Sequence, residues 1–253
     1  MQRVICLLPI IPIRKEPNHR SEQTSQLIFG EKADVQNQKD NWIEIKTLFD
    51  SYEGWIDANS VEVLDSRDPI QSAIITSEPI TICEHKGQKI YLTAGSEIPI
   101  PDSSHWFQYQ GNNFKLIDPV PIKKETSATA ILETAFKFLN APYLWGGRSV
   151  FGIDCSGFVQ IVFKIHGIPL PRDAKDQAKV GEIFESIDDI VQGDLVFFDN
   201  KEGKITHVGI ALNNNQIIHA SLSVKIDKLD QNGIFSLRRN EYTHSLSHIR
   251  HIL

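Results

Sequence analysis

A change in the spacing of apolar residues near residue 125 constrains the fold more than any other feature. Before it, short apolar runs recur at roughly 8–12-residue intervals between turn-forming residues, which is typical of small all-β domains. After it, Ile131, Ala135 and Phe138 fall on one face at helical spacing. The chain is therefore expected to begin with β-structure and to end in a domain that also contains helices.

The first half is predicted to form two small all-β barrels, at residues 1–63 and 64–122. Residues 42–46 alternate between apolar and polar side chains, as a half-buried strand does. Further strands are expected at 55–56, 74–75, 80–82, 89–92, 106–109 and 114–117. Pro119, Pro121, Lys123 and Lys124 indicate a linker before the second half.

The second half, residues 123–253, is predicted to be an α+β domain. Helices are expected over 130–139 and from Cys155 to a stop at Gly167. Strands are expected at 194–198, 207–212, 216–220 and 247–252. The asparagines at 213–215 predict a hairpin turn between the second and third of these strands.

The charge balance and the N-terminus bear on partners and location. With 26 Lys+Arg and 32 Asp+Glu among 253 residues the net charge is −6, which argues against a nucleic-acid partner. The sequence has no run of 18 or more apolar residues, so no membrane span is expected. Residues 4–13 are apolar but interrupted by Pro9 and Pro12, and are interpreted as a first strand rather than an export signal. The expected location is the cytoplasm.

Cysteine usage agrees with a reducing compartment. The chain has three cysteines, Cys6, Cys83 and Cys155, an odd number without a C-x-x-C pair, so a disulfide scaffold is not expected. No metal-binding motif and no phosphate-binding loop occurs, and Gly146-Gly147 is interpreted as a tight turn. No cofactor and no metal are predicted.

The strongest chemical signal is Cys155, which stands where a loop becomes a helix in the string DCSG. At a helix N-terminus, unpaired N–H groups and the helix dipole favour an anion, so the pKa of a thiol there is expected to fall. The thiolate is the nucleophilic form of cysteine. The alternative is that Cys155 is a small buried apolar residue.

Two histidines extend this signal to a catalytic set. His207 and His219 lie symmetrically about residue 213, so the two imidazoles are expected to face each other across the hairpin. If the helix of Cys155 packs on that face, the three residues supply a nucleophile, a base and an orienting group. A chance cross-strand pair is the alternative. Surface or packing roles are expected for His85, His105, His166, His244, His248 and His251.

The strings PYLWGG, DCSGFV, LPRDA, GDLVFF, THVGIAL and IIHAS resemble the NlpC-type cell-wall cysteine peptidases over about residues 125–253. The resemblance implies a papain-like α+β fold with Cys155 as nucleophile, His207 as general base and His219 as third polar residue. It also places Tyr143 near the oxyanion, where its hydroxyl would stabilise the tetrahedral intermediate. Trp145, in the same motif, is expected to be buried, so its truncation should cost about 3–5 kcal/mol.

Other motif positions suggest substrate contacts. In members that act on free peptides, the positions of Asp154 and Ser156 bind the N-terminal amine of the substrate, and a buried ammonium needs such a carboxylate partner. Arg172 and Asp173, in LPRDA, are interpreted equally as braces of the cleft or as binding residues.

The first half resembles bacterial SH3 domains through W-x-x-I and G-W-I. Two such domains before an NlpC-type domain resemble the γ-D-glutamyl-L-diamino acid endopeptidases of murein-peptide recycling, the dipeptidyl-peptidase VI class. The resemblance implies cleavage after L-Ala-γ-D-Glu and a requirement for a free N-terminal L-Ala, whose ammonium the first SH3 domain helps to bind. Glu22, Tyr52 and Glu53 are candidates for that contact, with ordinary surface charge and a strand-end aromatic as the alternative.

Three functions remain open from the sequence: this peptidase with a murein-derived peptide as partner, a thiol acyltransferase or amidase on the same scaffold, and a peptidoglycan-binding module. The sequence does not distinguish diaminopimelate from lysine as the diamino acid. It also leaves the peptide length and the oligomeric state open.

Overall fold

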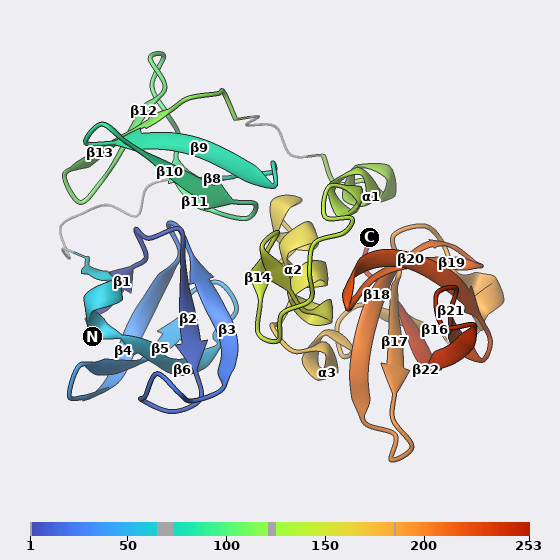
Figure 1. Cartoon of the computed structure of the whole chain (residues 1–253). Coiled ribbons are helices and arrows are strands. Elements are labelled where there is room, and N and C mark those ends of the chain that lie inside the picture. Colours follow the sequence, from blue (N-terminus) through green and yellow to red (C-terminus); the bar gives the residue numbers. More distant parts are fainter. Residues whose placement is uncertain (1, 65–72, 121–124, 185) are drawn as a thin grey trace. The chain divides into compact units, whose positions relative to one another are not determined.

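The computed structural model describes residues 2–64, 73–120, 125–184 and 186–253 (Figure 1). Its contacts divide the chain into two units. The N-terminal unit comprises Met1–Lys124 together with Trp145–Val150, and the C-terminal unit comprises Glu125–Leu144 together with Phe151–Leu253. The predicted boundary at 122/123 and the linker residues 121, 123 and 124 lie outside the described residues.

The first part of the N-terminal unit is an antiparallel sheet with strand order β3-β2-β6-β5-β4-β1-β7. The bounds are β1 Arg3–Ile5, β2 Ile10–Arg14, β3 Gln23–Ile28, β4 Lys32–Lys39, β5 Trp42–Thr47, β6 Glu53–Asp57 and β7 Glu62–Val63, with a 3-10 turn at Ala58–Ser60 before β7. Strand β5 alternates between buried and half-buried residues, which confirms the strand predicted at 42–46. The prediction of a single strand over residues 4–13 is wrong. The segment divides into β1 and β2 because the chain bends at Leu8–Pro9, where proline offers no N–H to a ladder.

The second part of the N-terminal unit contains two smaller sheets, ordered β10-β9-β13-β12 and β11-β8. The bounds are β8 Ala73–Ile75, β9 Ile80–His85, β10 Gln88–Thr93, β11 Glu97–Pro99, β12 Trp106–Tyr109 and β13 Asn112–Leu116. All of these except β11 overlap strands that the sequence predicts. Its core also takes in Ile5 and Phe29 from the first part, and the Phe29 ring contacts the rings of Phe107 and Phe114 edge-on. This shared core explains why the two parts form one unit.

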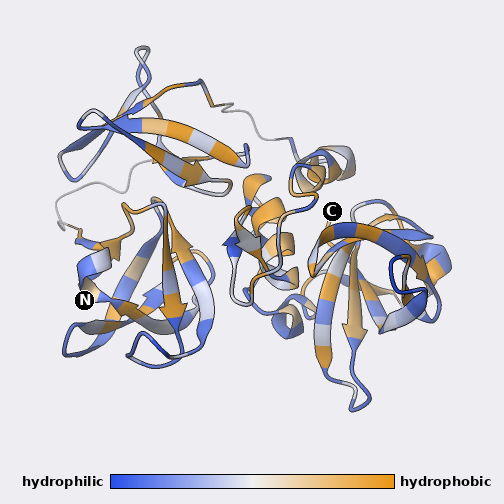
Figure 2. Cartoon of the chain, viewed as in Figure 1, coloured by the Kyte–Doolittle hydropathy of each residue, from blue (hydrophilic) through white to orange (hydrophobic). Residues whose placement is uncertain are grey.

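The helices of the C-terminal unit are α1 Ala128–Phe136, α2 Cys155–Ile165 and α3 Ala174–Gln177. Ser127 caps α1 by accepting a hydrogen bond from the backbone N–H of Ala130. Helix α1 ends three residues earlier than the predicted 139, and Asn140 adopts the left-handed conformation that ends the following turns. All residues of α2 are buried, in agreement with its mainly hydrophobic colour in Figure 2.

The sheet of the C-terminal unit has strand order β16-β22-β17-β18-β19-β20-β21, and an additional pairing of β22 with β21 closes six of these strands into a barrel. The bounds are β16 Glu182–Phe184, β17 Leu195–Asp199, β18 Ile205–Asn213, β19 Gln216–Ser221, β20 Ser223–Asp230, β21 Gly233–Ser236 and β22 Glu241–His251. The short strands β14 Arg148–Ser149 and β15 Gly152–Ile153 and a 3-10 turn at Ile187–Asp189 complete the chain. The sequence predicted β17, β18, β19 and the end of β22, but not β20 or β21. Helices followed by an antiparallel sheet confirm the α+β assignment.

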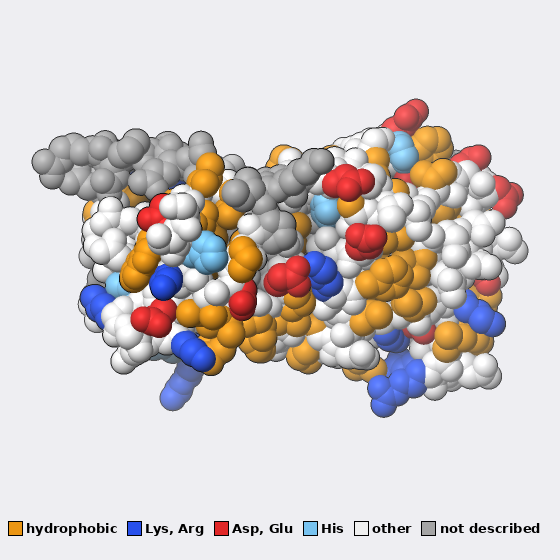
Figure 3. All heavy atoms as spheres, turned by 90° about the horizontal axis from the view of Figure 1, so that it is seen from above, with side chains coloured by type: hydrophobic (Ala, Val, Ile, Leu, Met, Phe, Trp, Pro, Cys, Tyr) orange, Lys and Arg blue, Asp and Glu red, His pale blue; other side chains and the backbone are white. Residues whose placement is uncertain are grey.

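The surface carries charges of both signs. On the face shown in Figure 3, acidic and basic side chains are interspersed with apolar ones. Among the described residues, no helix has the length and hydrophobicity needed to cross a membrane.

Candidate active site

The N-terminus of helix α2 positions the candidate nucleophile. Cys155 is the first residue of the helix, and Asp154 before it has extended backbone angles. The Asp154 carboxylate accepts a hydrogen bond of 2.7 Å from the backbone N–H of Gly157, which is the usual geometry of a helix cap. Helix α2 packs against β18 and β19 (Figure 1), the strands that carry His207 and His219.

The Cys155 thiol lies in a buried environment, with 7% of the residue exposed. Burial raises the pKa of this thiol to about 12, and the negative charge of Asp154 adds to the rise. The backbone N–H groups of Val208 and Ser156 and the charge of Arg172 lower the same pKa, but less. The predicted fall in thiol pKa at the helix N-terminus is therefore wrong, since desolvation outweighs it. The hydrogen bond with the Val208 backbone places the sulfur beside β18, at the residue that follows His207 in the sequence.

The two predicted histidines are hydrogen-bonded to each other. His207 Nε2 lies 2.8 Å from His219 Nδ1, and the ring planes cross at 87°. The predicted register is wrong by two residues, since Gly209 lies opposite His219. The turn is centred between residues 214 and 215 rather than at 213, and the register shift between Ala211 and Asn213 offsets only one residue of this difference. His207 is still on the same face, diagonal to His219, so the prediction that the imidazoles are neighbours is confirmed.

Gly209 makes this pairing possible. A Cβ atom at this position would lie 2.9 Å from the Cβ of His219 and 2.7 Å from Cδ1 of Ile217. Only a residue without a side chain fits there unless the strands separate. The glycine in THVGIAL thus leaves room for the His219 side chain.

Asp227, on β20, is a site residue that the sequence reasoning missed. Its Oδ2 lies 3.2 Å from His219 Nε2 and 2.8 Å from Lys225 Nζ, and its Oδ1 accepts a hydrogen bond from the backbone N–H of Leu237. Burial acts to raise the pKa of Asp227, but these hydrogen bonds and the charge of Lys225 lower it to about 2. The apolar alternation in Ser223–Asp230 was the signal for this strand.

The ionised Asp227 fixes the protonation of the histidine chain. A carboxylate only accepts hydrogen bonds, so His219 donates from Nε2 and accepts at Nδ1. His207 must then donate from Nε2 to His219. Its other nitrogen, Nδ1, is left without a proton in the neutral ring and is the atom that can accept one.

His244, on β22, is a second residue missing from the predicted site. Its ring stacks on that of His207 with centroids 4.1 Å apart and planes 25° apart. His244 does pack, as expected, but it packs against the candidate base. Only residues 247–252 of β22 were predicted to form a strand, so the sequence did not indicate where His244 lies. His166, His248 and His251 pack elsewhere in the C-terminal unit.

The histidines of this group are held neutral. Burial and then the nearby His219, His244 and Lys225 lower the pKa of His207 well below its ordinary value. Burial, followed by His219 and Lys225, lowers the pKa of His244 to about 4. A neutral imidazole beside a neutral thiol is an arrangement for proton transfer during reaction rather than for a preformed ion pair.

Arg172 holds Asp154 through two hydrogen bonds, Nη2 to Oδ2 at 2.6 Å and Nη1 to Oδ1 at 3.0 Å. Its Nη1 also donates to Ser156 Oγ at 2.9 Å. All three residues are buried. Of the two roles predicted for Arg172, the structure shows the bracing one. Asp173 is not joined to this group and pairs with Lys175 at 3.5 Å.

Tyr143 is close enough to the candidate nucleophile to interact with it electrostatically. Burial raises the pKa of Tyr143 to about 12, Asp154 and an ionised Cys155 act in the same direction, and Arg172 opposes them. Its backbone N–H is anchored to the carbonyl of Leu222. The phenol stays protonated at neutral pH, so it can donate a hydrogen bond.

The candidates of the first half lie in the N-terminal unit. Glu22 accepts a hydrogen bond of 2.8 Å from Trp145 Nε1, and Glu53 pairs with Lys46 at 2.9 Å. Tyr52 is half-buried against the core of the first sheet. The expected burial of Trp145 is wrong, because this residue is 60% exposed. Its segment, Trp145–Val150, packs within the N-terminal unit through other side chains.

Among the residues that the structure describes, no group of three or more His, Cys, Asp or Glu side chains is arranged to bind a metal ion.

Comparisons with known proteins fit this geometry. The sequence profile of the NlpC/P60 family matches residues 140–242, and that of the bacterial dipeptidyl-peptidase SH3 domain matches residues 13–61. The γ-D-glutamyl-L-lysine dipeptidyl-peptidase of Bacillus subtilis (strain 168) is 33% identical over 212 residues, covering 78% of this chain and 71% of that protein. Dipeptidyl-peptidase 6 of Lysinibacillus sphaericus is 25% identical over 250 residues, covering 85% and 88%.

A solved structure covers the whole architecture. The crystal structure of an NlpC/P60 family protein from Bacillus cereus ATCC 10987 matches with a TM-score of 0.85 over 99% of both chains. At 18% sequence identity this similarity concerns the fold alone.

Proposed function

Since the chain belongs to the NlpC/P60 peptidase family, with a papain-like fold and an SH3-like N-terminal domain, we propose that it hydrolyses the γ-D-glutamyl–diamino acid bond of murein peptides. The observation that carries this proposal is the hydrogen-bonded chain His207–His219–Asp227 in the sheet against which the helix that begins at Cys155 packs. The names of the Bacillus subtilis and Lysinibacillus sphaericus relatives support the substrate class.

In the first step, the Cys155 sulfur attacks the γ-carbonyl carbon of D-glutamate while its proton passes to Nδ1 of His207. His219 and Asp227 hold the ring in the tautomer that leaves Nδ1 free to accept, and they stabilise the imidazolium that forms. The carbonyl electrons move to oxygen, where the protonated Tyr143 donates a hydrogen bond.

In the second step, the carbon–nitrogen bond breaks and the leaving amine takes the proton from His207. A thioester to Cys155 remains. Water then gives a proton to His207 and attacks the thioester carbon, and the departing sulfur recovers the proton. The products are a peptide ending in D-glutamate and a free diamino acid or a peptide that begins with one.

We extend the proposal to substrates with a free N-terminal L-Ala, as in recycling of wall peptides in the cytoplasm. Asp154 and Ser156 would bind the ammonium, with Glu22, Tyr52 and Glu53 as further candidates. Burial of Asp154 supports this, because a buried ammonium requires a carboxylate. Arg172 already engages both oxygens of Asp154, so an ammonium would share them.

The proposal also covers the domain organisation. We propose that residues 64–122 form a second SH3-like domain, on the support of the two small sheets β10-β9-β13-β12 and β11-β8. The matched SH3 profile ends at residue 61.

The decisive experiment is incubation of the full chain with L-Ala-γ-D-Glu-diaminopimelate or with L-Ala-γ-D-Glu-L-Lys, followed by mass spectrometry. Release of the diamino acid is expected, and Cys155→Ala should reduce turnover on the order of 10,000-fold with the fold retained. Turnover by Cys155→Ala at a rate close to that of the wild type would show that Cys155 is not the nucleophile. Transfer of the acyl group to another acceptor would instead indicate an acyltransferase.

Specificity for the free amine needs a second substrate pair. The N-acetylated tripeptide should be cleaved much more slowly than the free one, and Asp154→Asn should raise KM for the free form more than for the acetylated form. Equal cleavage of both forms would remove the L-Ala requirement and leave the peptidase proposal standing.

A further inference from the structure

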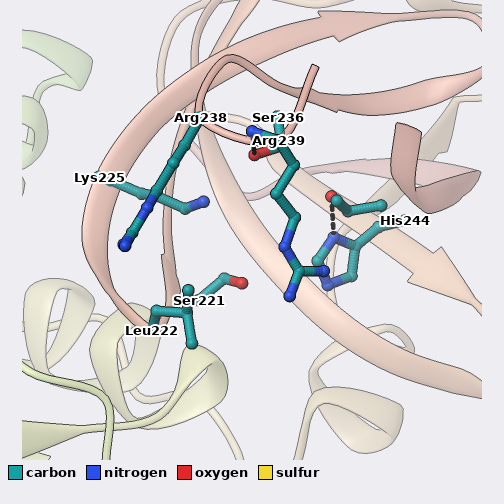
Figure 4. Close-up of a pocket in the computed structure, with 8 residues that line it drawn as sticks. Ser221, Leu222, Lys225, Ser236, Arg238, Arg239 and His244 are labelled. Atoms are coloured by element: carbon teal, nitrogen blue, oxygen red, sulfur yellow. Dashed lines mark hydrogen bonds between the residues drawn. The ribbon is translucent and has the colours of Figure 1, made fainter. Parts of the chain in front are cut away.

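A pocket of about 210 Å³ opens in the C-terminal unit beside the candidate base (Figure 4). Eight residues line it, among them Lys225, Arg238, Arg239 and His244. In Figure 4 the side chains of Lys225, Arg238 and Arg239 approach the same space, with His244 beside it. Three of the eight lining residues are therefore cationic, and no lining residue is acidic.

The pocket keeps positive charge after its ion pairs are counted. Lys225 pairs with Asp227 at 2.8 Å, and Arg239 lies 3.6 Å from Glu241. Arg238 forms no ion pair with any residue that the structure describes, and its side chain is exposed. Such a pocket favours an anion that can accept hydrogen bonds from guanidinium groups. A carboxylate can accept two parallel hydrogen bonds from one guanidinium group, in bidentate geometry.

The position of the pocket indicates which part of a substrate reaches it. His244 forms part of its wall and also stacks on His207, with ring centroids 4.1 Å apart. In the proposed reaction His207 gives its proton to the leaving amine, so the leaving half of the substrate must pass His207. The acyl half lies instead with Cys155 and Tyr143.

We propose that this pocket binds a carboxylate of the leaving diamino acid and so selects substrates in which that carboxylate is free. The inference rests on the proposed function. In L-Ala-γ-D-Glu-L-Lys the leaving residue is C-terminal, and its α-carboxylate is attached to the carbon that also carries the released nitrogen. A carboxylate this close to the scissile bond can reach a pocket next to His207.

The charges around the pocket would couple carboxylate binding to the base. The titratable and charged groups that face His244 are His207, which stacks on it, and His219, Lys225, Asp227 and Arg239. Burial is the main cause that lowers the pKa of His244, followed by His219, Lys225 and Arg239, while Asp227 opposes them. Lys225 also lowers the pKa of His207. A carboxylate seated among these cations offsets their charge, so His207 becomes a better proton acceptor when the substrate is in place.

The test compares L-Ala-γ-D-Glu-L-Lys with the same peptide ending in a carboxamide. The wild-type full chain should prefer the acid by about tenfold in kcat/KM, as expected for loss of one charge-assisted contact. Arg238→Gln should reduce this preference to about threefold or less by slowing only the acid. Lys228→Gln is the matched control, since it removes an exposed cation from the same unit outside the pocket.

Equal wild-type kcat/KM on acid and amide would overturn the proposal, as would an Arg238→Gln variant that slows both peptides alike. Binding of the same two peptides to Cys155→Ala, measured by calorimetry, separates this proposal from the proposed function. Preference for the acid in binding, lost in Cys155→Ala/Arg238→Gln, would support the pocket even if the wild type cleaves neither peptide. Equal affinities would overturn it.

Discussion

Each unit contains a buried arginine that donates hydrogen bonds from two nitrogens to a buried carboxylate. In the N-terminal unit, Arg148 binds Glu31 with Nη1–Oε2 and Nη2–Oε1 distances of 2.7 and 2.9 Å. In the C-terminal unit, Arg172 binds Asp154 at 2.6 and 3.0 Å. The two pairs are nearly identical in geometry and burial, so any difference in their roles comes from their surroundings.

The surroundings of Arg148 are backbone and amide groups. Its Nη1 also donates to the carbonyl of Gln26, and its own backbone N–H donates to Oε1 of Gln26. These contacts join the Trp145–Val150 segment to β3 and to the turn that follows it. The pair therefore holds a segment in place.

The surroundings of Arg172 include the candidate nucleophile. Burial is the main cause of the raised pKa of Cys155, but Asp154 raises it further and Arg172 lowers it, so this pair acts on the thiol as well as holding the start of α2. A buried ion pair adds little net stability over an apolar replacement, whereas loss of one partner is costly. The same arginine–carboxylate motif therefore holds a segment in place in one unit, and in the other it both holds a helix start and acts on a thiol.

The largest effect is expected for Arg172→Met. It leaves the Asp154 carboxylate buried without its partner, so the free energy of unfolding of the C-terminal unit should fall by about 3–5 kcal/mol. Displacement of the start of α2 should reduce kcat/KM on the order of 100-fold. Denaturant unfolding and tripeptide kinetics measure the two effects. Lys179→Met, which breaks an exposed pair with Asp176, is the control. If Arg172→Met keeps the wild-type kcat/KM, the Arg172–Asp154 pair has no chemical role.

Arg148→Met should produce a similar loss of stability without a chemical effect. The uncompensated Glu31 should lower the free energy of unfolding of the N-terminal unit by about 3–5 kcal/mol, which amide hydrogen exchange in β3 and β4 can measure. The rate of Cys155 alkylation by iodoacetamide should stay at the wild-type value. A slower alkylation would show that both pairs act on the thiol. Lys46→Met, in an exposed pair, should cost less than about 1 kcal/mol.

The chemical centre was predictable because its signals are local. Cys155 follows a capping aspartate at a loop-to-helix change, and His207 and His219 flank a recognisable turn. Asp227 was missed because β20, the strand that pairs with β19, was not predicted, although its sequence carried a signal. His244 was missed because it lies on the unpredicted part of β22, which pairs with β17 and is distant in sequence from the hairpin.

Burial was harder to predict than secondary structure. The thiol pKa was expected to fall from the helix N-terminus, but the surrounding protein removes water from Cys155 and reverses the direction. In PYLWGGR the aromatic Trp145 was expected inside, whereas Arg148 occupies the buried position because Glu31 and Gln26 receive it. The partners are 117 and 122 residues away in sequence, so no local pattern indicates them.

Asp154→Asn tests the two opposing charges on the thiol. The Asp154 charge raises the pKa of Cys155 and Arg172 lowers it, so removal of the acid should lower this pKa and increase the thiolate fraction at a given pH. Alkylation at pH 8 should accelerate by about three- to tenfold, since below the pKa one unit changes the thiolate fraction tenfold. Asparagine still caps a helix, so α2 should remain folded. Unchanged or slower alkylation would show that Asp154 does not influence the thiol.

The smallest effect is expected for Trp145→Ala, in the same segment as Arg148. Trp145 is 60% exposed and makes one side-chain hydrogen bond, to Glu22, so its truncation should change the free energy of unfolding by less than about 1 kcal/mol. Arg148→Met, which replaces a buried side chain of the same segment, serves as the contrast. Hydrogen exchange of the N-terminal unit measures both variants under one condition. A loss of several kcal/mol in Trp145→Ala would mean that the segment is held by its aromatic residue, and the buried ion pair would then no longer account for its position.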